Sequence, residues 1–397
     1  MMHKSGLSRV LWRGLAAPLA LGGLLGGLAA GLGPATMASA ATCQVQGSPQ
    51  PVSPASNNNE PHSVAVISSC DAWLVGFDLD AKANHGANHV FSEHFDGTAW
   101  KEVPVPTGTL GTLGSELNGV SAVSGNSVYA VGEFADPNRA TPVVEHWNGT
   151  VWTPQTQLGV GDAELDSVRA ISDSDIWVTG SSFNLNGSSR QPLILHFDGR
   201  TWTRTPVPPV GGPGDDIRVL SVAASSPGNV WAVGDDFTGR DRPFILHWTG
   251  SGWEQSGFAP LPGDADLASV TTTSPFDAWA VGSAGDTPSQ TLTMHWNGEG
   301  WVRVPSPDPG GDAGLSGVTA TSRTSVFAVG AVTAGNDAVD TLVLRWDGHH
   351  WTQVTTPNPA NLNRLNAVAA DAPSDVWAVG TAEGASVPVR AFAVHGF

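Results

Sequence analysis

The sequence predicts an all-β protein, a seven-bladed β-propeller built from four-stranded antiparallel blades. A short sequence motif of the type Asp-Val-Trp-Ala-Val-Gly occurs seven times, and the final glycines of successive copies are 56, 48, 54, 48, 48 and 50 residues apart. Around each copy lie short runs of alternating apolar and polar residues, which are typical of half-buried strands. Repeats of this length stack into one body, because no single repeat can bury a core alone.

The third repeat shows the four predicted strands of one unit. They cover residues 165–172, 175–181, 192–197 and 201–205, and a tight turn at Asp198-Gly199 joins the last two. An Asp-Gly pair favours a two-residue hairpin because both central residues of that turn need a positive φ. Similar pairs recur at Asp96-Gly97, Asn148-Gly149, Asn297-Gly298 and Asp347-Gly348, with Thr249-Gly250 as a weaker copy. No segment has a sustained helical period.

The two ends of the chain predict how the ring of blades closes. The last repeat contains only three predicted strands, the third of them at residues 392–397. Residues 43–49 are similar in sequence to residues 351–357, the predicted fourth strand of the preceding repeat. We therefore expect an N-terminal strand to complete the last blade. This pairing would tie both termini into one sheet and remove the open edges that a broken ring exposes.

Residues 1–40 are predicted to be a secretory signal peptide, followed by the propeller over residues 41–397. Basic residues precede an apolar run over residues 15–32, and Ala38-Ser39-Ala40 supplies the small residues that a signal peptidase accepts. The alternative is a retained membrane anchor, which the glycines of the run and Pro34 disfavour. We expect the mature chain to be secreted, extracellular and monomeric, with no membrane span.

Cys43 and Cys70 are the two cysteines of the chain, and both follow the predicted signal peptide. Export to an oxidising compartment favours a disulfide between them. Such a bond would stabilise the fold by about 3–4 kcal/mol in the loop-entropy model. Two cysteines with these neighbours cannot form a metal cluster or a thiol enzyme.

The charge of the chain restricts its partners. Asp and Glu number 36 against 18 Lys and Arg, a net charge of −18. Such a field repels phosphate backbones and anionic membranes, so we expect no nucleic-acid partner. Cations, cationic polymers and neutral glycans remain open as ligands. A simpler interpretation is that the acidic charge keeps a secreted protein soluble.

The consensus sequence of the repeats reads LxxVxAxSxxDVWAVG followed by LxxHWDGxxWxxVPxP. It resembles a secreted propeller repeat of actinobacteria and related soil bacteria. This resemblance covers residues 41–397 and implies the fold, but it does not imply a function. In repeat length and in its predicted export, the chain also resembles the kelch-repeat propellers of the galactose-oxidase type, although the paired glycines of kelch repeats are absent. Turns such as residues 95–100 are similar to the Asp-box of bacterial sialidases, with a spacing one residue shorter.

Two enzymatic activities of these related families are excluded by residue type. A sialidase needs a tyrosine nucleophile and an arginine triad, and the single tyrosine, Tyr129, occupies the repeated tryptophan position. Galactose oxidase needs a cross-linked cysteine–tyrosine pair, which one tyrosine and two N-terminal cysteines cannot supply. Tyr129 is therefore predicted to be structural.

The repeated histidines and tryptophans are also predicted to be structural. Each histidine of the set lies on the third strand of a different blade, so they cannot converge on one metal ion; they are His94, His146, His196, His247 and His295. We expect them to hydrogen-bond to neighbouring strands or turns. Eleven of the sixteen tryptophans fall at two repeat positions, where large aromatic side chains fill the space between blades.

The candidate ligand-binding residues lie where each innermost strand begins, at the mouth of the predicted central channel. Aligned by the repeat, one ring position holds Glu60, Glu116, Glu164, Arg218, Asp266, Gly314 and Arg364. A second ring, two residues further along and on the same side, holds His62, Asn118, Asp166, Leu220, Ala268, Ser316 and Asn366. The candidate binding residues are therefore Glu60, His62, Glu116, Asn118, Glu164, Asp166, Arg218, Asp266 and Arg364.

Three interpretations of this ring remain open. Oxygen ligands from several strands suit calcium, for which the ligands would be Glu60, Asn118, Asp166 and Asn366. Propeller lactonases are similar in holding an ion at the mouth, although no motif of theirs matches here. Paired carboxylates could instead perform acid–base catalysis. The third interpretation is a solvated mouth with salt-bridged charges.

We expect a non-catalytic binding module that recognises an extracellular glycan, cell-wall component or protein through its top-face loops, because repeat folds bind through their variable segments. No cofactor other than possible calcium is expected. The alternative is a hydrolase or lyase, lactonase-like or glycan-active, that uses the acidic mouth. A purely structural surface protein is a further alternative.

Overall fold

The computed structural model describes residues 43, 50–51 and 59–397, apart from 80–87, 107–113, 137–138, 184–188, 213, 334–337 and 385–386. The predicted signal peptide over residues 1–40 lies outside the described residues. The described residues form strands and connecting turns, and none of them is helical. No helix in the described residues is long and apolar enough to cross a membrane.

Five sheets each contain four antiparallel strands that follow one another in the chain. The first two comprise β2 (Asn59–Ser68), β3 (Asp71–Leu79), β4 (Asn88–Phe95) and β5 (Trp100–Glu102), then β6 (Gly114–Ser124), β7 (Ser127–Asp136), β8 (Arg139–Trp147) and β9 (Trp152–Pro154). The third comprises β10 (Ala163–Ser172), β11 (Asp175–Phe183), β12 (Arg190–Phe197) and β13 (Trp202–Arg204). These bounds differ from the predicted strands of the third repeat by at most two residues at each end.

The fourth and fifth sheets repeat the pattern. They comprise β14 (Ile217–Ser226), β15 (Asn229–Asp236), β16 (Arg242–Trp248) and β17 (Trp253–Ser256), then β18 (Ala265–Ser274), β19 (Asp277–Ala284), β20 (Gln290–Trp296) and β21 (Trp301–Arg303). The Asp-Gly and Asn-Gly turns are confirmed, because Gly97, Gly149, Gly199, Gly298 and Gly348 all have a positive φ.

The remaining strands form an eight-stranded sheet. They are β22 (Ala313–Ser322), β23 (Ser325–Thr333), β24 (Val339–Trp346), β25 (Trp351–Val354), β26 (Leu362–Ala372), β27 (Asp375–Gly384), β28 (Val387–His395) and β1 (Gln50–Pro51). One parallel residue pair, Val339 with Leu362, joins β24 to β26. Gln50 and Pro51 of β1 pair with Ala393 and Phe392 of β28, so an N-terminal segment adds to the last repeat. Of the stretch predicted for this strand, residues 43–49, only Cys43 lies within the described residues.

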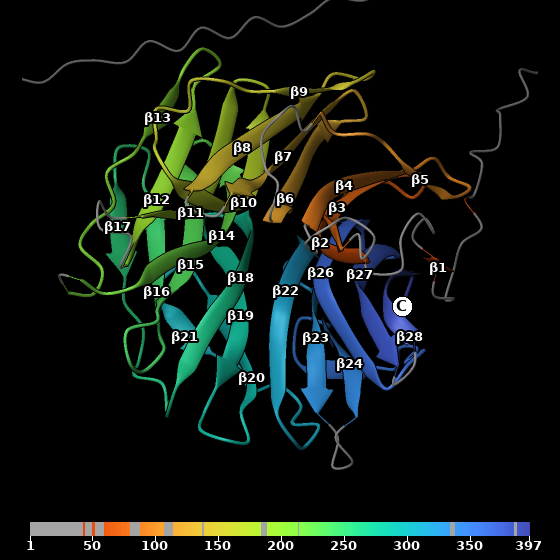
Figure 1. Cartoon of the computed structure of the whole chain (residues 1–397). Coiled ribbons are helices and arrows are strands. Elements are labelled where there is room, and N and C mark those ends of the chain that lie inside the picture. The colour runs from red at the N-terminus through yellow and green to blue at the C-terminus, as the bar shows by residue number, and fades with distance from the viewer. Residues whose placement is uncertain are drawn as a thin grey trace, which may run out of the picture. The chain divides into compact units, whose positions relative to one another are not determined.

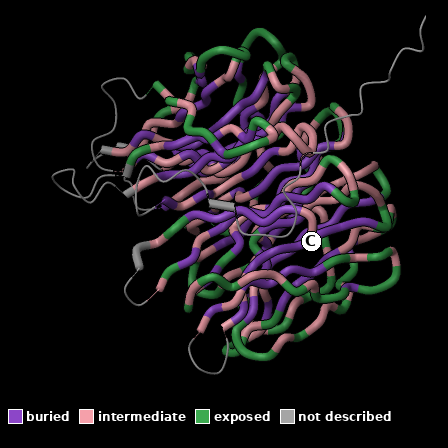
Figure 2. Tube along the Cα trace, turned by 90° about the vertical axis from the view of Figure 1, so that its right-hand side faces the viewer, coloured by how far each residue is buried: buried purple, intermediate pink, exposed green. Residues whose placement is uncertain are grey.

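The innermost strands follow one another around a common centre (Figure 1). Strands β2, β6, β10, β14, β18, β22 and β26 each contact the next in this order, and β26 contacts β2. The buried segments form the inner part of each sheet, whereas the connecting turns are exposed (Figure 2). This arrangement brings side chains from separate repeats into one central region.

The core lies between successive sheets and is dominated by the repeated tryptophans. Trp231 of β15 is fully buried, and its ring packs edge-on against Trp301 of the next sheet, with ring centroids 5.1 Å apart. Trp377 of β27 packs in the same way against Trp100 of the first sheet, at 5.3 Å. The predicted packing of tryptophans between units is therefore confirmed, including the contact between the last repeat and the first.

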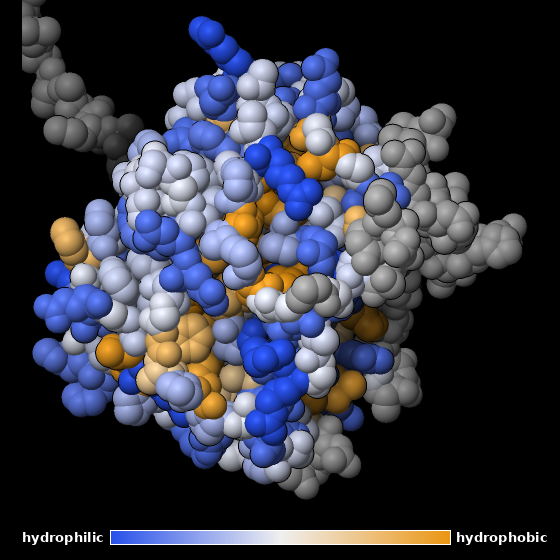
Figure 3. Space-filling model, turned by 90° about the vertical axis from the view of Figure 1, so that its left-hand side faces the viewer, coloured by the Kyte–Doolittle hydropathy of each residue, from blue (hydrophilic) through white to orange (hydrophobic). Residues whose placement is uncertain are grey.

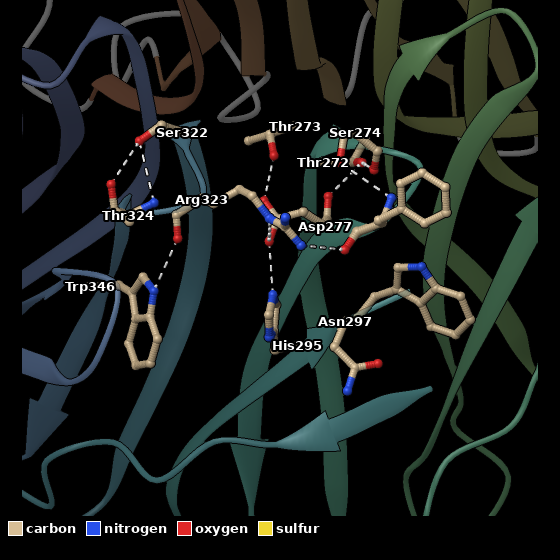
Figure 4. Close-up of polar contacts among 12 residues, drawn as sticks. Thr272, Thr273, Ser274, Asp277, His295, Asn297, Ser322, Arg323, Thr324 and Trp346 are labelled. Carbon is tan, nitrogen blue, oxygen red and sulfur yellow. Dashed lines mark hydrogen bonds and ion pairs between the residues drawn. The ribbon is translucent and has the colours of Figure 1, made fainter. Parts of the chain in front are cut away.

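The repeated histidines have the structural role that was predicted. In the fifth sheet, His295 stacks on Trp279 with ring centroids 4.3 Å apart, and its Nε2 lies 2.8 Å from Asp277 Oδ1 (Figure 4). Thr273 donates a hydrogen bond to the same carboxylate, and Arg323 reaches it from the neighbouring repeat at 3.9 Å. Burial raises the pKa of Asp277, but these partners outweigh it and hold the pKa below its usual value.

A disulfide joins Cys43 to Cys70, with Cα atoms 5.6 Å apart, as predicted. It ties the N-terminal segment to the turn between β2 and β3.

On the face over β13 and β17, hydrophilic side chains surround smaller apolar areas (Figure 3). The exposed large apolar residues of the described chain are Val123, Val151, Phe276 and Val302.

Candidate functional site

Every innermost strand carries a β-bulge at the same position. In β6, for example, Leu117 and Gly119 pair with successive residues of β7, which leaves Asn118 as the extra residue. The seven extra residues are His62, Asn118, Asp166, Leu220, Ala268, Ser316 and Asn366. Bulges re-aim side chains, and these seven residues line one central cavity of about 170 Å³, here called the upper chamber. The structure thus brings the second predicted ring together.

The bulge also explains the final glycine of each repeat. A Cβ added at Gly132 would lie 1.9 Å from the carbonyl oxygen of Glu116, and the other six glycines face equivalent carbonyls at 1.8–2.2 Å. Only glycine allows so close an approach of two backbones. The repeated glycine therefore places the ring residues of the neighbouring strand.

The first predicted ring pairs with the residues that follow these glycines. Glu116 of β6 lies opposite Glu133 of β7, and Arg218 of β14 lies opposite Asp235 of β15. Neither Glu133 nor Asp235 is among the candidate residues predicted from the sequence. Their common position directly after the repeated glycine is the signal that could have identified them.

Asn118 connects three successive repeats at the top of the upper chamber. Its Oδ1 lies 2.8 Å from Nδ1 of His62, on the preceding repeat. Its amide nitrogen donates to Glu133 Oε2 at 3.1 Å and to the carbonyl oxygen of Leu165, on the following repeat, at 3.2 Å. Both polar atoms of the Asn118 side chain are therefore engaged.

Two arginines neutralise part of the acidic charge. Arg218 donates from Nη2 to Asp166 Oδ1 at 2.6 Å, a contact between the fourth and third repeats. Arg190 of β12 contacts Glu164 at 3.2 Å and Asp216 at 3.1 Å. The predicted site included neither Arg190 nor Asp216, although Asp216 lies two residues before the ring residue Arg218.

Burial raises the pKa of several carboxyl groups of this region, and repulsion between neighbouring carboxylates adds to the effect. The pKa of Glu133 rises to about 9 because the group is buried and faces Glu116, Glu164 and Asp166. Burial raises the pKa of Asp235 to about 8, although its Oδ1 accepts the backbone N–H of Leu267 at 3.1 Å.

Asp166 belongs to the same set, since burial raises its pKa to about 6 against the opposing effect of Arg218. Asp166 Oδ2 and Asp235 Oδ2 are buried and have no hydrogen-bond partner within the described part of the chain. We call Glu116, Glu133, Glu164, Asp166 and Asp235 the acid cluster. Arg218 acts on the pKa of Glu133, Asp166 and Asp235, so it lies among them.

Of the other candidate residues, Asp266 lies beside the acid cluster, since its charge raises the pKa of Asp235. Glu60 and Arg364 line a separate cavity of about 180 Å³ beside Glu383. Asp266 accepts hydrogen bonds from the backbone and hydroxyl of Ser283, and burial raises its pKa.

The four predicted calcium ligands are divided between these two cavities. Asn118, Asp166 and Asn366 line the upper chamber, whereas Glu60 lines the other cavity. The Asn366 amide donates to the carbonyl oxygen of Pro61 at 2.9 Å. Within the described ranges, no three His, Cys, Asp or Glu side chains are arranged to hold a metal ion. Calcium binding at the mouth stays a prediction.

The sequence matches no family model, and no curated protein matches it. Similar solved structures include YCF48 bound to a D1 peptide, with 14% identity and a TM-score of 0.55 over 88% of this chain and 96% of that chain. A PL25 polysaccharide lyase, ulvan lyase, bound to -[GlcA(1-4)Rha3S]- has 12% identity and a TM-score of 0.55 over 86% and 94% of the two chains. These structures are β-propellers. The chain has a β-propeller fold. A protein of unknown function from Dyadobacter fermentans, at 12% identity and a TM-score of 0.53 over 87% and 96%, also matches.

Proposed function

We propose that the chain is a secreted seven-bladed propeller whose ring closes through its N-terminal strand. The contact of β26 with β2 and the pairing of β1 with β28 support closure. The single residue pair between β24 and β26 supports counting the eight-stranded sheet as two blades. Residues 1–40 would be the signal peptide and residues 41–397 the propeller. The Cys43–Cys70 disulfide supports export, because such bonds persist in oxidising compartments.

We infer that the propeller is a non-catalytic binding protein that accepts an amine-bearing group at the acid cluster. The carrying observation is the gathering of carboxyl groups at one place: Glu133 lies opposite Glu116 on the paired strand, and Asp166 Oδ2 is buried without a hydrogen-bond partner in the described part of the chain. Burial and the neighbouring carboxylates accordingly raise the pKa of Glu133. A proton on Glu133 relieves repulsion that a ligand cation could relieve instead. The ligand would be an extracellular protein or glycan, and the cation a lysine side chain or an amino sugar.

The size of the upper chamber limits how the ligand enters. Its volume is about 170 Å³, and a water molecule takes about 30 Å³ of liquid volume. The chamber therefore has room for the end of a side chain rather than for a folded segment or a sugar chain. The main body of the ligand would lie across the mouth. One similar solved structure contains a bound peptide and another a bound glycan, so the fold alone does not indicate which class of ligand this chain binds.

The binding prediction can be tested with two amine probes and their acetylated twins. At about pH 6, where ammonium groups are charged, we expect tetralysine or a glucosamine tetramer to bind. Tetralysine acetylated on its α-amino and all ε-amino groups, or the N-acetylglucosamine tetramer, should not bind. Glu116→Gln and Asp166→Asn should each weaken binding at least about tenfold, because a charged partner is lost. Titration calorimetry measures both effects.

The matched control is Glu299→Gln, which removes the same charge from an exposed turn residue. This variant should bind like the original protein. Calcium is included as a competing cation, because it would occupy the same carboxylates. Unchanged affinity in both cluster variants would place the binding site elsewhere.

A glycan-active hydrolase or lyase is the second candidate, and the pairing of Glu116 with Glu133 favours it. Two adjacent carboxyl groups with pKa values pushed apart can act as base and acid. Release of new reducing or unsaturated ends from a glycan panel, abolished by Glu133→Gln, would support the enzyme. Binding without such product supports the binding module.

A further inference from the structure

A second cavity continues inward from the upper chamber. It has a volume of about 290 Å³ and shares Val64, Val120, Val168 and Val318 with the upper chamber. We call it the lower chamber. Three residues beyond each bulge, the seven innermost strands contribute Ala65, Ser121, Arg169, Ala223, Thr271, Thr319 and Ala369 to its wall. Six of these seven side chains are small and uncharged.

Arg169 of β10 is the one charged side chain among the described residues that line this chamber. Its side chain reaches the solvent of the cavity, while the surrounding strands shield the guanidinium from bulk water. This shielding lowers the pKa of Arg169, and no carboxylate offsets the effect. Over the described ranges, the side chain of Arg169 makes no hydrogen bond and no ion pair, whereas the side chains of Arg190 and Arg218 both contact carboxylates. The lower chamber therefore contains an uncompensated positive charge.

Hydroxyl groups that line the same chamber as Arg169 can complete a set of donors. Ser121 Oγ accepts the backbone N–H of Ala170 at 3.1 Å, which leaves its own hydrogen free to donate. Thr271 and Thr319 also line the chamber, and neither hydroxyl has a partner within the described part of the chain. A guanidinium with several neutral donors is the combination that binds an oxyanion.

We propose that the lower chamber is an anion site, in which Arg169 binds one carboxylate, sulfate or phosphate group. The chamber volume exceeds that of several water molecules, so such a group fits with part of its hydration shell. The occupant is either a free ion or the acidic end group of a glycan or peptide. The proposal does not rest on the amine-binding function of the acid cluster.

The two chambers then select opposite charges at different depths of one cavity. Asp166 lines the upper chamber and Arg169 the lower one, three residues apart on β10. This separation corresponds to about 10 Å along an extended strand. A ligand that enters from the end of the cavity far from the acid cluster would reach Arg169 without passing the carboxylates.

The test compares Arg169→Gln with Arg303→Gln, an arginine exposed on β21 that loses the same charge. Each protein is titrated with sodium sulfate and with a sulfated tetrasaccharide, against sodium chloride of equal ionic strength to remove screening effects. We expect the original protein and Arg303→Gln to bind at least one of the two probes, and Arg169→Gln to bind at least about tenfold more weakly. Arg169→Lys, which retains the charge without the planar fork, should show intermediate affinity.

The probes also distinguish the two sources of the anion. Binding of sulfate alone indicates a free ion, whereas binding of the tetrasaccharide alone indicates an end group on a polymer. Thermal unfolding of the variants without anion is a second measurement. Arg169→Gln should be at least as stable as the original protein, because no ion pair is lost. The proposal is overturned if neither probe binds the original protein, or if Arg169→Gln binds as tightly as Arg303→Gln.

Discussion

Replacing Trp231 with alanine is expected to lower the free energy of unfolding by about 3–5 kcal/mol, as is usual for a tryptophan removed from a packed core. Trp231 is fully buried, and its ring stacks on His247 with ring centroids 3.9 Å apart. It also contacts Trp296 and Trp301 of the next sheet, at 5.0 and 5.1 Å. The substitution therefore opens a cavity at a junction between two sheets. Denaturant unfolding followed by tryptophan fluorescence measures the loss.

Phe276→Ala is the matched control for this experiment. Phe276 is also a large aromatic residue, but 62% of it is exposed at the turn before β19. Surface substitutions of this kind usually change stability by less than about 0.5 kcal/mol. A loss from Trp231→Ala no larger than that from Phe276→Ala would contradict the packing of tryptophans between sheets.

Stability is expected to fall as pH rises from about 5 to about 8, by an amount on the order of 3 kcal/mol. Glu133 and Asp235 have pKa values of about 9 and about 8 in the folded protein, against ordinary values of 4.5 and 3.8. Between those limits the folded protein retains protons that the unfolded chain releases. Unfolding then releases protons, so a higher pH favours it. Partial solvent access to Glu133 reduces the effect.

The double variant Glu133→Gln and Asp235→Asn should flatten this slope, because neither amide can lose a proton. Part of the dependence of the unfolding free energy on pH should persist in this double variant, since burial also raises the pKa of Glu145 to about 7. Glu299→Gln, in an exposed turn, should leave the slope unchanged. Denaturant midpoints measured at several pH values test the prediction, and stability that rises steadily with pH would refute it.

The sequence pattern predicts the sheets well because each repeat contains local turn signals and alternating strands. It also predicts which residues surround the centre, since the repeat aligns Asn118 with Asp166 and Asn366. The bulge that re-aims these side chains was not predicted. A bulge interrupts the alternation by one residue, and the glycine that permits it lies on a different strand.

The membership of the acid cluster was predicted only in part. Glu133 and Asp235 follow the repeated glycine and were not among the predicted candidates, although β7 and β15 continue through them. Their environment depends on side chains from neighbouring repeats, and no local pattern records such contacts. Arg190 contacts Glu164 and Asp216, each of which lies 26 residues away from it in sequence. Contacts between residues so far apart cannot be predicted from composition.

The central claim, that a ligand amine replaces the proton on Glu133, is tested most directly by counting protons. Titration of the original protein with tetralysine at about pH 6, in two buffers of different ionisation enthalpy, gives the number released on binding. The account predicts release of up to about one proton per bound amine, and little release from Glu133→Gln. Equal heats in both buffers, with tetralysine bound as tightly to Glu133→Gln as to the original protein, would contradict it.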